Sequence, residues 1–413
     1  MPHPTSYAGG EHTLHKTSSG QIWSAGACGL GWCRQLPLDS SLFKFRPVHI
    51  PAHVKFVYAS YYHNLALGES GKLYSWGCGT FTEGNLDGVI PALGQGRFAS
   101  DVGKSPIEVQ LPLKKDMNGN MEKVVDITGG AYHSAVLLNT GRILTFGAGQ
   151  LGQLGRKIGK DGADASNLPV DPEPREAEVP LVNGMKQKIE KLGSGFYNTF
   201  AISSEGKLFC TGENQNKQCG AGPKNLNSMT QVKEMNNEVV QQVEGGYCHT
   251  LVKTLSGKVF SFGCGDDGQR GIKDVDQVAA QVTLPTEAKQ VAAGANHSVI
   301  LGKDGHVYAF GANDVGQCGV QSDPRVFDDD DDDEEDDGEG PVYLPKKVDL
   351  PKDAGEIIHI SAGYAHTVLS SKSGKTFVFG QNDNGQLGFG GESIDRGEDP
   401  DKQVRPVEVS TDS

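Results

Sequence analysis

One short phrase recurs seven times along the chain, and it constrains the fold more than any other feature. Each copy consists of a small residue or Gly, two variable residues, and a His that is usually followed by Ser or Thr. The seven His positions are occupied by His12, His63, His133, Asn198, His249, His297 and His366. Self-similarity at such intervals is the signature of an architecture built from repeated units.

Two glycines follow each copy at fixed distances, the first eight residues after the His position and the second six residues later. They are Gly20 and Gly26, Gly71 and Gly77, Gly141 and Gly147, Gly206 and Gly212, Gly257 and Gly263, Gly305 and Gly311, and Gly374 and Gly380. Because both spacings hold in all seven copies, chance cannot supply them. The variation in unit length is confined to loops outside these fixed spacings.

The segments between these anchors predict strands. Apolar and polar residues alternate in 199–202 and 207–210, and a Gly such as Gly257 between two such segments indicates a tight hairpin. A further strand follows, often opened by a proline such as Pro106, and another precedes the next His phrase, as at 124–127. Each unit therefore contributes four strands.

Seven four-stranded units predict a closed ring, because an open array would leave sheet edges exposed. The expected fold class is all-β: a seven-bladed β-propeller of four-stranded blades, formed by residues 1–413 as a single domain. We expect the C-terminal strand, 404–409, to close the ring by completing the first blade, since residues 1–7 are poor strand material.

Composition agrees with this fold and limits the location of the protein. The 56 glycines among 413 residues are nearly double the usual share of about 7% and argue against long helices. No apolar run approaches about 18 residues, so no membrane insertion is expected. The N-terminus lacks the basic and apolar parts of a secretory signal. We expect a cytoplasmic or nuclear protein.

The negative charge is concentrated in one stretch. Eleven acidic residues lie between Asp328 and Glu339, and without them the net charge of −14 would be −3. Such a run repels itself and has no apolar side chain, so 320–340 is expected to be a disordered acidic loop inserted in the sixth unit. Its functional alternative is contact with a basic partner. No basic stripe accompanies it, so direct nucleic-acid binding is not expected.

The cysteines and histidines predict structural roles. The eight cysteines include no C-x-x-C pair and are expected to be reduced, and packing is favoured over zinc for Cys219 and Cys318, which stand where other repeats have Leu. One His per blade is too dispersed to share a metal ion, so we expect these residues to bridge strands by hydrogen bonds. We expect no cofactor and no metal.

Two Gly-Lys sequences, 103–105 and 374–376, imitate a phosphate-binding loop. Such a loop requires another Gly five positions before its second Gly, and Phe98 and Leu369 stand there instead. Nucleotide binding through either segment is therefore not expected.

The repeat also carries a family resemblance. Its spacing, together with Gly-Gln-Leu-Gly at 152–155 and 385–388, resembles the repeats of the regulator of chromosome condensation family over nearly the whole chain. The resemblance implies a seven-bladed propeller. Many members are interaction platforms linked to small GTPases, ubiquitin ligases or cilia, and the founding member is the nucleotide exchange factor for the GTPase Ran on chromatin.

The two variable residues before each His are the main candidates for recognition. Every unit places them in the same inter-strand loop, so they are expected on one face around the central channel. Tyrosine offers apolar area and a hydroxyl at low entropic cost, which suits a protein-binding face, although the same rings could merely pack neighbouring blades. The expected partner-binding residues are Tyr61, Tyr62, Tyr132, Phe196, Tyr197, Tyr247 and Tyr364.

These observations favour a non-enzymatic propeller that binds a protein partner as scaffold or regulator, and the resemblance implies a role in a small-GTPase pathway. The resemblance implies an alternative, a guanine nucleotide exchange factor for a Ran-type GTPase. That activity needs no covalent chemistry, only a wedge-like loop in the second unit. The candidate wedge residues are Thr80, Phe81, Thr82, Glu83, Asn85 and Asp87, with Asp383 as a candidate GTPase contact.

Overall fold

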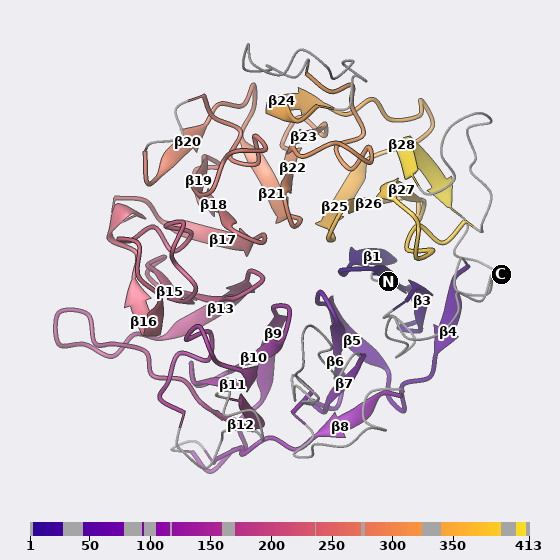
Figure 1. Ribbon diagram of the computed structural model, residues 1–413. Coiled ribbons are helices and arrows are strands. Elements are labelled where there is room, and N and C mark those ends of the chain that lie inside the picture. The colour runs from indigo at the N-terminus through magenta and orange to yellow at the C-terminus, as the bar shows by residue number, and fades with distance from the viewer. Residues whose placement is uncertain are drawn as a thin grey trace, which may run out of the picture.

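Seven four-stranded antiparallel sheets are arranged as a ring in the computed structural model (Figure 1). The structure describes residues 3–27, 44–77, 93–94, 105–115, 118–158, 170–235, 237–273, 277–323, 340–389 and 402–409. In each blade the strands follow one another in chain order, with the first strand at the centre of the ring and the fourth at its rim. The predicted seven-bladed β-propeller is confirmed.

The blades are contiguous segments of the chain. The first comprises β1 (Thr5–Ala8), β2 (His12–Lys16), β3 (Ile22–Gly26) and β4 (Arg46–Val48), and the second β5 (Val54–Ala59), β6 (His63–Gly68), β7 (Leu73–Gly77) and β8 (Ile107–Val109). The third has β9 (Val124–Gly129), β10 (His133–Leu138), β11 (Ile143–Ala148) and β12 (Val170–Glu176), and the fourth β13 (Ile189–Ser194), β14 (Asn198–Ser203), β15 (Leu208–Gly212) and β16 (Leu226–Gln231).

The remaining blades repeat this order after a short 3-10 turn, η3 (Lys233–Met235). The fifth has β17 (Val240–Gly245), β18 (His249–Thr254), β19 (Val259–Gly263) and β20 (Ala280–Val282), and the sixth β21 (Ala288–Ala293), β22 (His297–Gly302), β23 (Val307–Gly311) and β24 (Val342–Lys347). The seventh has β25 (Ile357–Ala362), β26 (His366–Ser371), β27 (Thr376–Gln381) and β28 (Lys402–Val409).

The two chain ends lie in different blades, which corrects one expectation. The C-terminal strand β28 pairs with β27 as the fourth strand of the seventh blade, and it does not complete the first blade. The first blade obtains its inner strand from Thr5–Ala8, where Ser6 and Ala8 are buried and their neighbours half-buried. This short alternation is sufficient because the strand is covered on both sides by neighbouring blades.

The ring closes between β1 and the seventh blade through side chains and loops. The backbone N–H of Ser6 donates to Ser370 Oγ at 2.9 Å, and that of Ala8 donates to Ser361 Oγ at 2.9 Å. The Tyr364 N–H donates to Gly9 O at 3.2 Å. Within the described residues, the first and last blades exchange no strand, since each consists of its own four strands.

The recurring histidines join neighbouring blades, which confirms their predicted structural role. Each His Nε2 lies at hydrogen-bond distance from the residue after the next blade's His position. The pairs are His12–Asn64 at 2.6 Å, His63–Ser134 at 2.7 Å, His133–Thr199 at 2.9 Å, His249–Ser298 at 2.9 Å, His297–Thr367 at 2.9 Å and His366–Thr13 at 3.1 Å. These bonds connect blades rather than strands of one sheet.

The acceptors of the hydroxyl groups fix the direction of these bonds. The Thr199 hydroxyl donates its single proton to Gln153 O at 2.8 Å, so it accepts from His133 Nε2–H. The same holds for Thr13, Ser298 and Thr367, which donate to glutamine carbonyls of the preceding blade. The repeated Gly-Gln-x-Gly sequence therefore supplies a carbonyl to the next blade.

The Gly that opens most copies of the phrase leaves room for the imidazole. A Cβ on Gly130 would overlap the His133 ring and lie 2.5 Å from Gly195 O. Burial keeps these rings neutral: it lowers the pKa of His12 and His133 to about 4 and that of His63 to about 3. Neighbouring histidines depress the pKa of His63 further.

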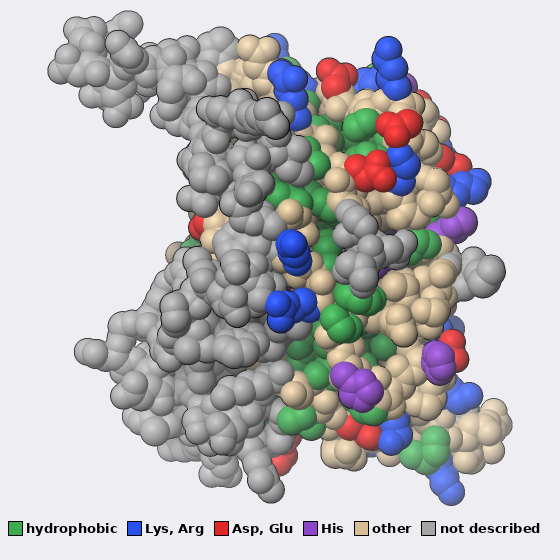
Figure 2. Space-filling view, turned by 90° about the vertical axis from the view of Figure 1, so that its right-hand side faces the viewer, with side chains coloured by type: hydrophobic (Ala, Val, Ile, Leu, Met, Phe, Trp, Pro, Cys, Tyr) green, Lys and Arg blue, Asp and Glu red, His purple; other side chains and the backbone are tan. Residues whose placement is uncertain are grey.

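Apolar contacts between adjacent blades form the core. Between the second and third blades, Leu65 and Leu73 pack with Val136 and Phe146, all nearly inaccessible to solvent. On the outer surface, Lys and Arg side chains are interspersed with Asp, Glu and apolar groups (Figure 2). Lys375, for example, pairs with Asp353 and Glu408. Lys375 is the lysine of the Gly-Lys sequence at 374–376, so its ammonium group is engaged in ion pairs at the surface.

The cysteine expectation was wrong for four residues. Cys210 is bonded to Cys219 and Cys248 to Cys264, each pair with its Cα atoms 5.6 Å apart. Cys210 lies on β15 and Cys219 in the turn that follows it, whereas Cys248 and Cys264 flank the paired strands β18 and β19, next to the His249–Gly263 pair. Cys318 is free and buried, which confirms the packing interpretation at that position. Cys28, Cys33 and Cys78 lie outside the described residues.

Candidate functional site: an aromatic cap at one end of the channel

Six aromatic side chains meet at one end of the central channel. This aromatic cap consists of Tyr61, Tyr62, Tyr132, Phe196, Tyr197 and Tyr247, all from loops between the first and second strands of blades two to five. The sequence predicted that these loops share a face, and the ring contacts bring the residues together. Tyr364 comes from the equivalent loop of the seventh blade.

Phe196 is the centre of the cap. Its ring centroid lies 4.5 Å from that of Tyr61, 4.8 Å from that of Tyr197 and 5.0 Å from that of Tyr247, and these rings belong to three different blades. Tyr62 and Tyr132 stack at 5.0 Å beside it. The edge-on contacts of Phe196 and the stacked pair both stabilise the cluster beyond the contribution of the apolar area that it buries.

Backbone hydrogen bonds hold the loops of the cap in place. The Ala131 N–H donates to Phe196 O at 2.9 Å, and the Phe196 N–H donates to Gly246 O at 2.9 Å, so each loop is bonded to the loop of the next blade. The Tyr247 N–H continues this series to Ala295 O at 2.9 Å. The cap is therefore preorganised, which lowers the entropic cost of binding a partner.

Burial divides the cap into a packed part and an exposed part. Phe196 is only 4% exposed and packs blades together, while Tyr62, Tyr132 and Tyr197 are half-buried. Tyr247 is 45% exposed and Tyr364 is 47% exposed. The packing interpretation thus describes Phe196, whereas Tyr247 and Tyr364 are exposed to solvent.

Carboxylates lie on the same face as the cap, in turns of the fifth, sixth and seventh blades. The residue that follows the second anchor Gly bonds to the loop of the cap, as when the Glu213 N–H donates to Tyr197 O at 3.0 Å, so the turns after the third strands lie on the same face. They carry Asp266, Asp267 and Asp314, and burial, then the two neighbouring carboxylates, raise the pKa of Asp267. Asp383 lies in the equivalent turn of the seventh blade and accepts from Gln381 and Gln386.

Two expected features lie outside the described residues: the candidate wedge residues Thr80 to Asp87 and the acidic run from Asp328 to Glu339. The base of the acidic loop is described. The Asp323 N–H donates to Pro341 O at 3.1 Å, and Lys346 pairs with Asp323 at 2.5 Å. The acidic loop therefore belongs to the connection between β23 and β24, which also contains Asp314.

The sequence did not point to the channel beneath the cap. Its polar side chains, including Tyr58 and Glu244, come from the first strands of the blades. Those strands precede the His phrase and carry no fixed residue of the repeat, so no recurring pattern marks them. Among the described residues, no three His, Cys, Asp or Glu side chains gather as a metal site would require.

The comparisons with known proteins identify the repeat. The model of the RCC1-like domain matches residues 5–322 and 88–412. The ultraviolet-B receptor UVR8 of Arabidopsis thaliana is 31% identical over 270 residues, which cover 64% of this chain and 53% of the receptor. The regulator of chromosome condensation of Mus musculus is 28% identical over 298 residues, covering 68% of this chain and 63% of that protein. The matches thus span less than two thirds of either relative.

Solved structures share the fold. Yeast RCC1 (Prp20), solved with Kap60, has a TM-score of 0.70 at 21% identity and covers 98% of this chain, with 85% of its own length matched. Prp20p of Saccharomyces cerevisiae, reported together with its binding to Gsp1p and histones, has a TM-score of 0.66 at 23% identity, with coverage of 87% and 80%. Within the described residues, no helix is long and apolar enough to cross a membrane.

Proposed function

Since this chain belongs to the RCC1-like domain family, we propose that it is a non-enzymatic propeller that binds a protein partner through the aromatic cap, as scaffold or regulator. The observation that carries the proposal is the pair of exposed rings, Tyr247 and Tyr364, on a preorganised face of half-buried tyrosines. Interface hot spots are enriched in tyrosine and lie in the centre of the contact, surrounded by polar residues.

The negative charge near the cap favours a partner with basic residues. Asp266, Asp267, Asp314 and Asp383 lie in turns on the face of the rings, and Asp323 and Pro341, which bound the acidic segment, belong to the same connection as Asp314. A partner that inserts apolar groups between the tyrosines and carries basic residues at its edge would match both features. A Ran-type small GTPase and core histones are the partners to test, because yeast Prp20p is reported with binding to Gsp1p and histones.

The test uses the two exposed rings and a matched control. The double variant Tyr247→Ala, Tyr364→Ala should weaken capture of the immobilised partner by about tenfold or more, because truncation of a hot spot costs about 2 kcal/mol. Tyr343→Ala is the control, since Tyr343 is 37% exposed but lies on β24 at the rim. Equal affinity of the double variant and the control for either partner would contradict the proposal.

The acidic loop is tested separately. Replacing 328–339 with a Gly-Ser linker should leave the melting temperature unchanged and weaken capture of core histones at low salt. At about 0.5 M salt the screening length falls to about 4 Å, so little difference should remain. If both versions capture histones equally at low salt, the loop has no part in recognition.

The alternative function is guanine nucleotide exchange on a Ran-type GTPase, with the loop at 80–88 as the wedge. It is supported by the match to the regulator of chromosome condensation and by the carboxylates in the turns on the face of the cap. Stopped-flow release of a fluorescent nucleotide from Ran tests it, with the 80–88 segment replaced by a Gly-Ser linker as the control. Release no faster than that of Ran alone would exclude exchange and leave the binding proposal intact.

A further inference from the structure

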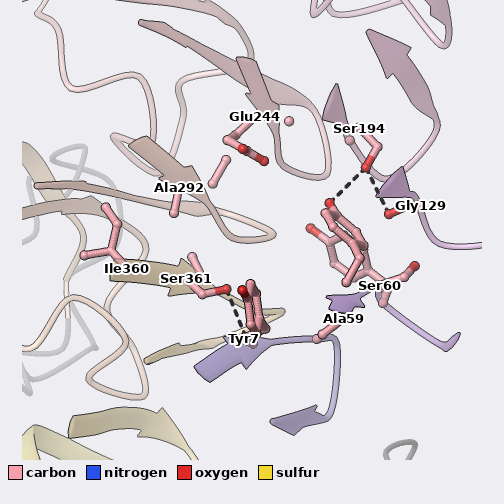
Figure 3. Close-up of a pocket in the computed structure, with 18 of the residues that line it drawn as sticks. Tyr7, Ala59, Ser60, Gly129, Ser194, Glu244, Ala292, Ile360 and Ser361 are labelled. Atoms are coloured by element: carbon pink, nitrogen blue, oxygen red, sulfur yellow. Dashed lines mark hydrogen bonds between the residues drawn. The ribbon is translucent and has the colours of Figure 1, made fainter. Parts of the chain in front are cut away.

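A cavity of about 310 Å³ occupies the centre of the ring, lined by the innermost strand of every blade. Glu244 on β17 and Tyr7 on β1 enter it from different sides (Figure 3). The volume lies at the lower end of the roughly 300–1,000 Å³ that small-molecule sites enclose. The cavity is therefore large enough for a ligand and is distinct from the exposed rings of the cap.

The cavity contains a carboxylate whose charge is not compensated. Glu244 accepts a hydrogen bond from Gln242 Nε2 at 3.0 Å, and among the described residues no lysine or arginine pairs with it. Burial raises the pKa of Glu244 to about 7, and the negative charge of Asp126 adds to that shift. The Glu244 side chain is half-buried and lines the cavity, so its carboxylate is accessible there to a cationic ligand.

Two further polar groups in the cavity have no hydrogen-bond partner within the described part of the chain. They are the Tyr61 hydroxyl and His359 Nε2, both fully buried. His359 Nδ1 accepts from Gln290 Nε2 at 3.1 Å, so Nε2 carries the proton and is an unused donor. Buried polar groups in native proteins are nearly always satisfied, and those that are not require an explanation.

The apolar part of the lining is aromatic. The Tyr7 ring lies 4.8 Å from the ring of His359 and 6.2 Å from that of Phe56. The Tyr58 hydroxyl is already engaged with Ser194 at 3.0 Å, so Tyr58 presents mainly its ring. Aromatic faces attract cations as well as apolar groups.

We propose that the central channel is a binding site for a small organic cation, a primary amine carried on a short apolar body. The ammonium pairs with Glu244, and the apolar body lies against Phe56 and the tyrosine rings. An acceptor on a larger ligand would satisfy His359 Nε2–H. This site does not depend on the docking of a protein at the cap.

The test is isothermal titration of the whole chain with 2-phenylethylamine at about pH 8, where both Glu244 and the amine are charged. The wild type should bind the amine at least about tenfold more tightly than the neutral isostere 2-phenylethanol, because only the amine forms the ion pair. Glu244→Gln keeps the shape of the side chain and should weaken amine binding about tenfold or more. Glu287→Gln, which removes an exposed carboxylate paired with Lys303, should leave it unchanged.

Three results would overturn the proposal. They are no heat of binding with the amine, equal affinity of the wild type for the amine and the alcohol, and equal amine affinity of Glu244→Gln and Glu287→Gln. The comparison of the two probes needs only the wild type, so the proposal stays testable if a variant does not fold. None of these results bears on capture of a partner by the cap.

Discussion

The fourth blade differs from the other six in the residue that links it to its neighbour. In six blades a histidine forms a hydrogen bond across the blade interface, whereas Asn198 turns back into its own blade and donates to Glu213 O at 2.6 Å. The disulfide between Cys210 and Cys219 lies beside it, with Cys219 Sγ 3.4 Å from Asn198 Nδ2. The fourth and fifth blades remain joined without the imidazole.

The remaining contacts at that interface explain why the ring tolerates the exchange. Thr250 of the fifth blade still donates to Gln218 O at 2.8 Å, and the Phe196 N–H still donates to Gly246 O. Only the imidazole part of the link is missing. The difference shows that the link between blades has separable parts: an imidazole, a hydroxyl bonded to a glutamine carbonyl, and a backbone bond between loops.

The largest expected effect is the loss of folding stability at acidic pH, which reports on the imidazole part of the link alone. Because burial lowers the pKa of each linking His below its unfolded value of about 6.5, the native state binds fewer protons than the unfolded state. Their stabilisation is complete above pH 6.5 and is lost as the pH falls towards about 4. Each contributes about 1.4 kcal/mol per pH unit, or roughly 8 kcal/mol for six at pH 5.5.

Urea unfolding at about pH 7.5 and 5.5 measures this loss, and a variant isolates one histidine. His133→Asn, which copies the fourth blade, should reduce the acid-induced loss between these two pH values by about 1.4 kcal/mol in total. An unchanged loss in the variant would mean that His133 does not titrate as a buried group.

A matched pair of glycine substitutions has the next largest effect. At Gly130 a Cβ would overlap the His133 ring, whereas at Gly195, beside Asn198, its nearest neighbour would be Gly246 O at 3.1 Å. Gly130→Ala should therefore lower the free energy of unfolding by about 3 kcal/mol and Gly195→Ala by less than about 1 kcal/mol. Denaturant midpoints at neutral pH give the values. Similar losses at both sites would show that the imidazole is not what requires the glycine.

The reciprocal exchange at neutral pH has the smallest effect. His133→Asn removes the bond to Thr199 and leaves a gap, so a loss of about 2 kcal/mol is expected. Asn198→His gives up the bond to Glu213 O but finds the Thr250 hydroxyl in place, and should change stability by less than about 1 kcal/mol. Thermal melts at pH 7.5 compare the two. A larger loss for Asn198→His would show that the fourth blade has lost the space for a ring.

The repeat predicted the fold closely because its fixed residues have contacts that are the same in every blade. Gly257, with φ of 81°, forms the hairpin that the spacing indicated, and the His positions open the second strands. The prediction that the C-terminal strand completes the first blade was wrong because β1 was not recognised as a strand. β1 has only four residues, too few for a clear pattern, and it is held by hydrogen bonds to the seventh blade.

The candidate site could be predicted in part. The loop position identified Tyr61 and Phe196 as residues of the cap. No sequence pattern indicates that Phe196 is buried against rings of other blades while Tyr364 is exposed, because residues from other blades determine the burial of each ring. The disulfides were missed since Cys210 and Cys219 are separated by a turn rather than by a known motif. Glu244 was missed because the repeat leaves the inner strands free to vary.

The closure of the ring has a consequence for how the protein is made. Every blade is one uninterrupted stretch of polypeptide, so each can fold as it leaves the ribosome, without waiting for distant sequence. The seam depends on distant sequence, since the Ser6 N–H donates to Ser370 Oγ, which is 364 residues away. Until synthesis has passed the seventh blade, the inner strand of the first has an unsatisfied edge, and that is the period in which a chaperone would be needed.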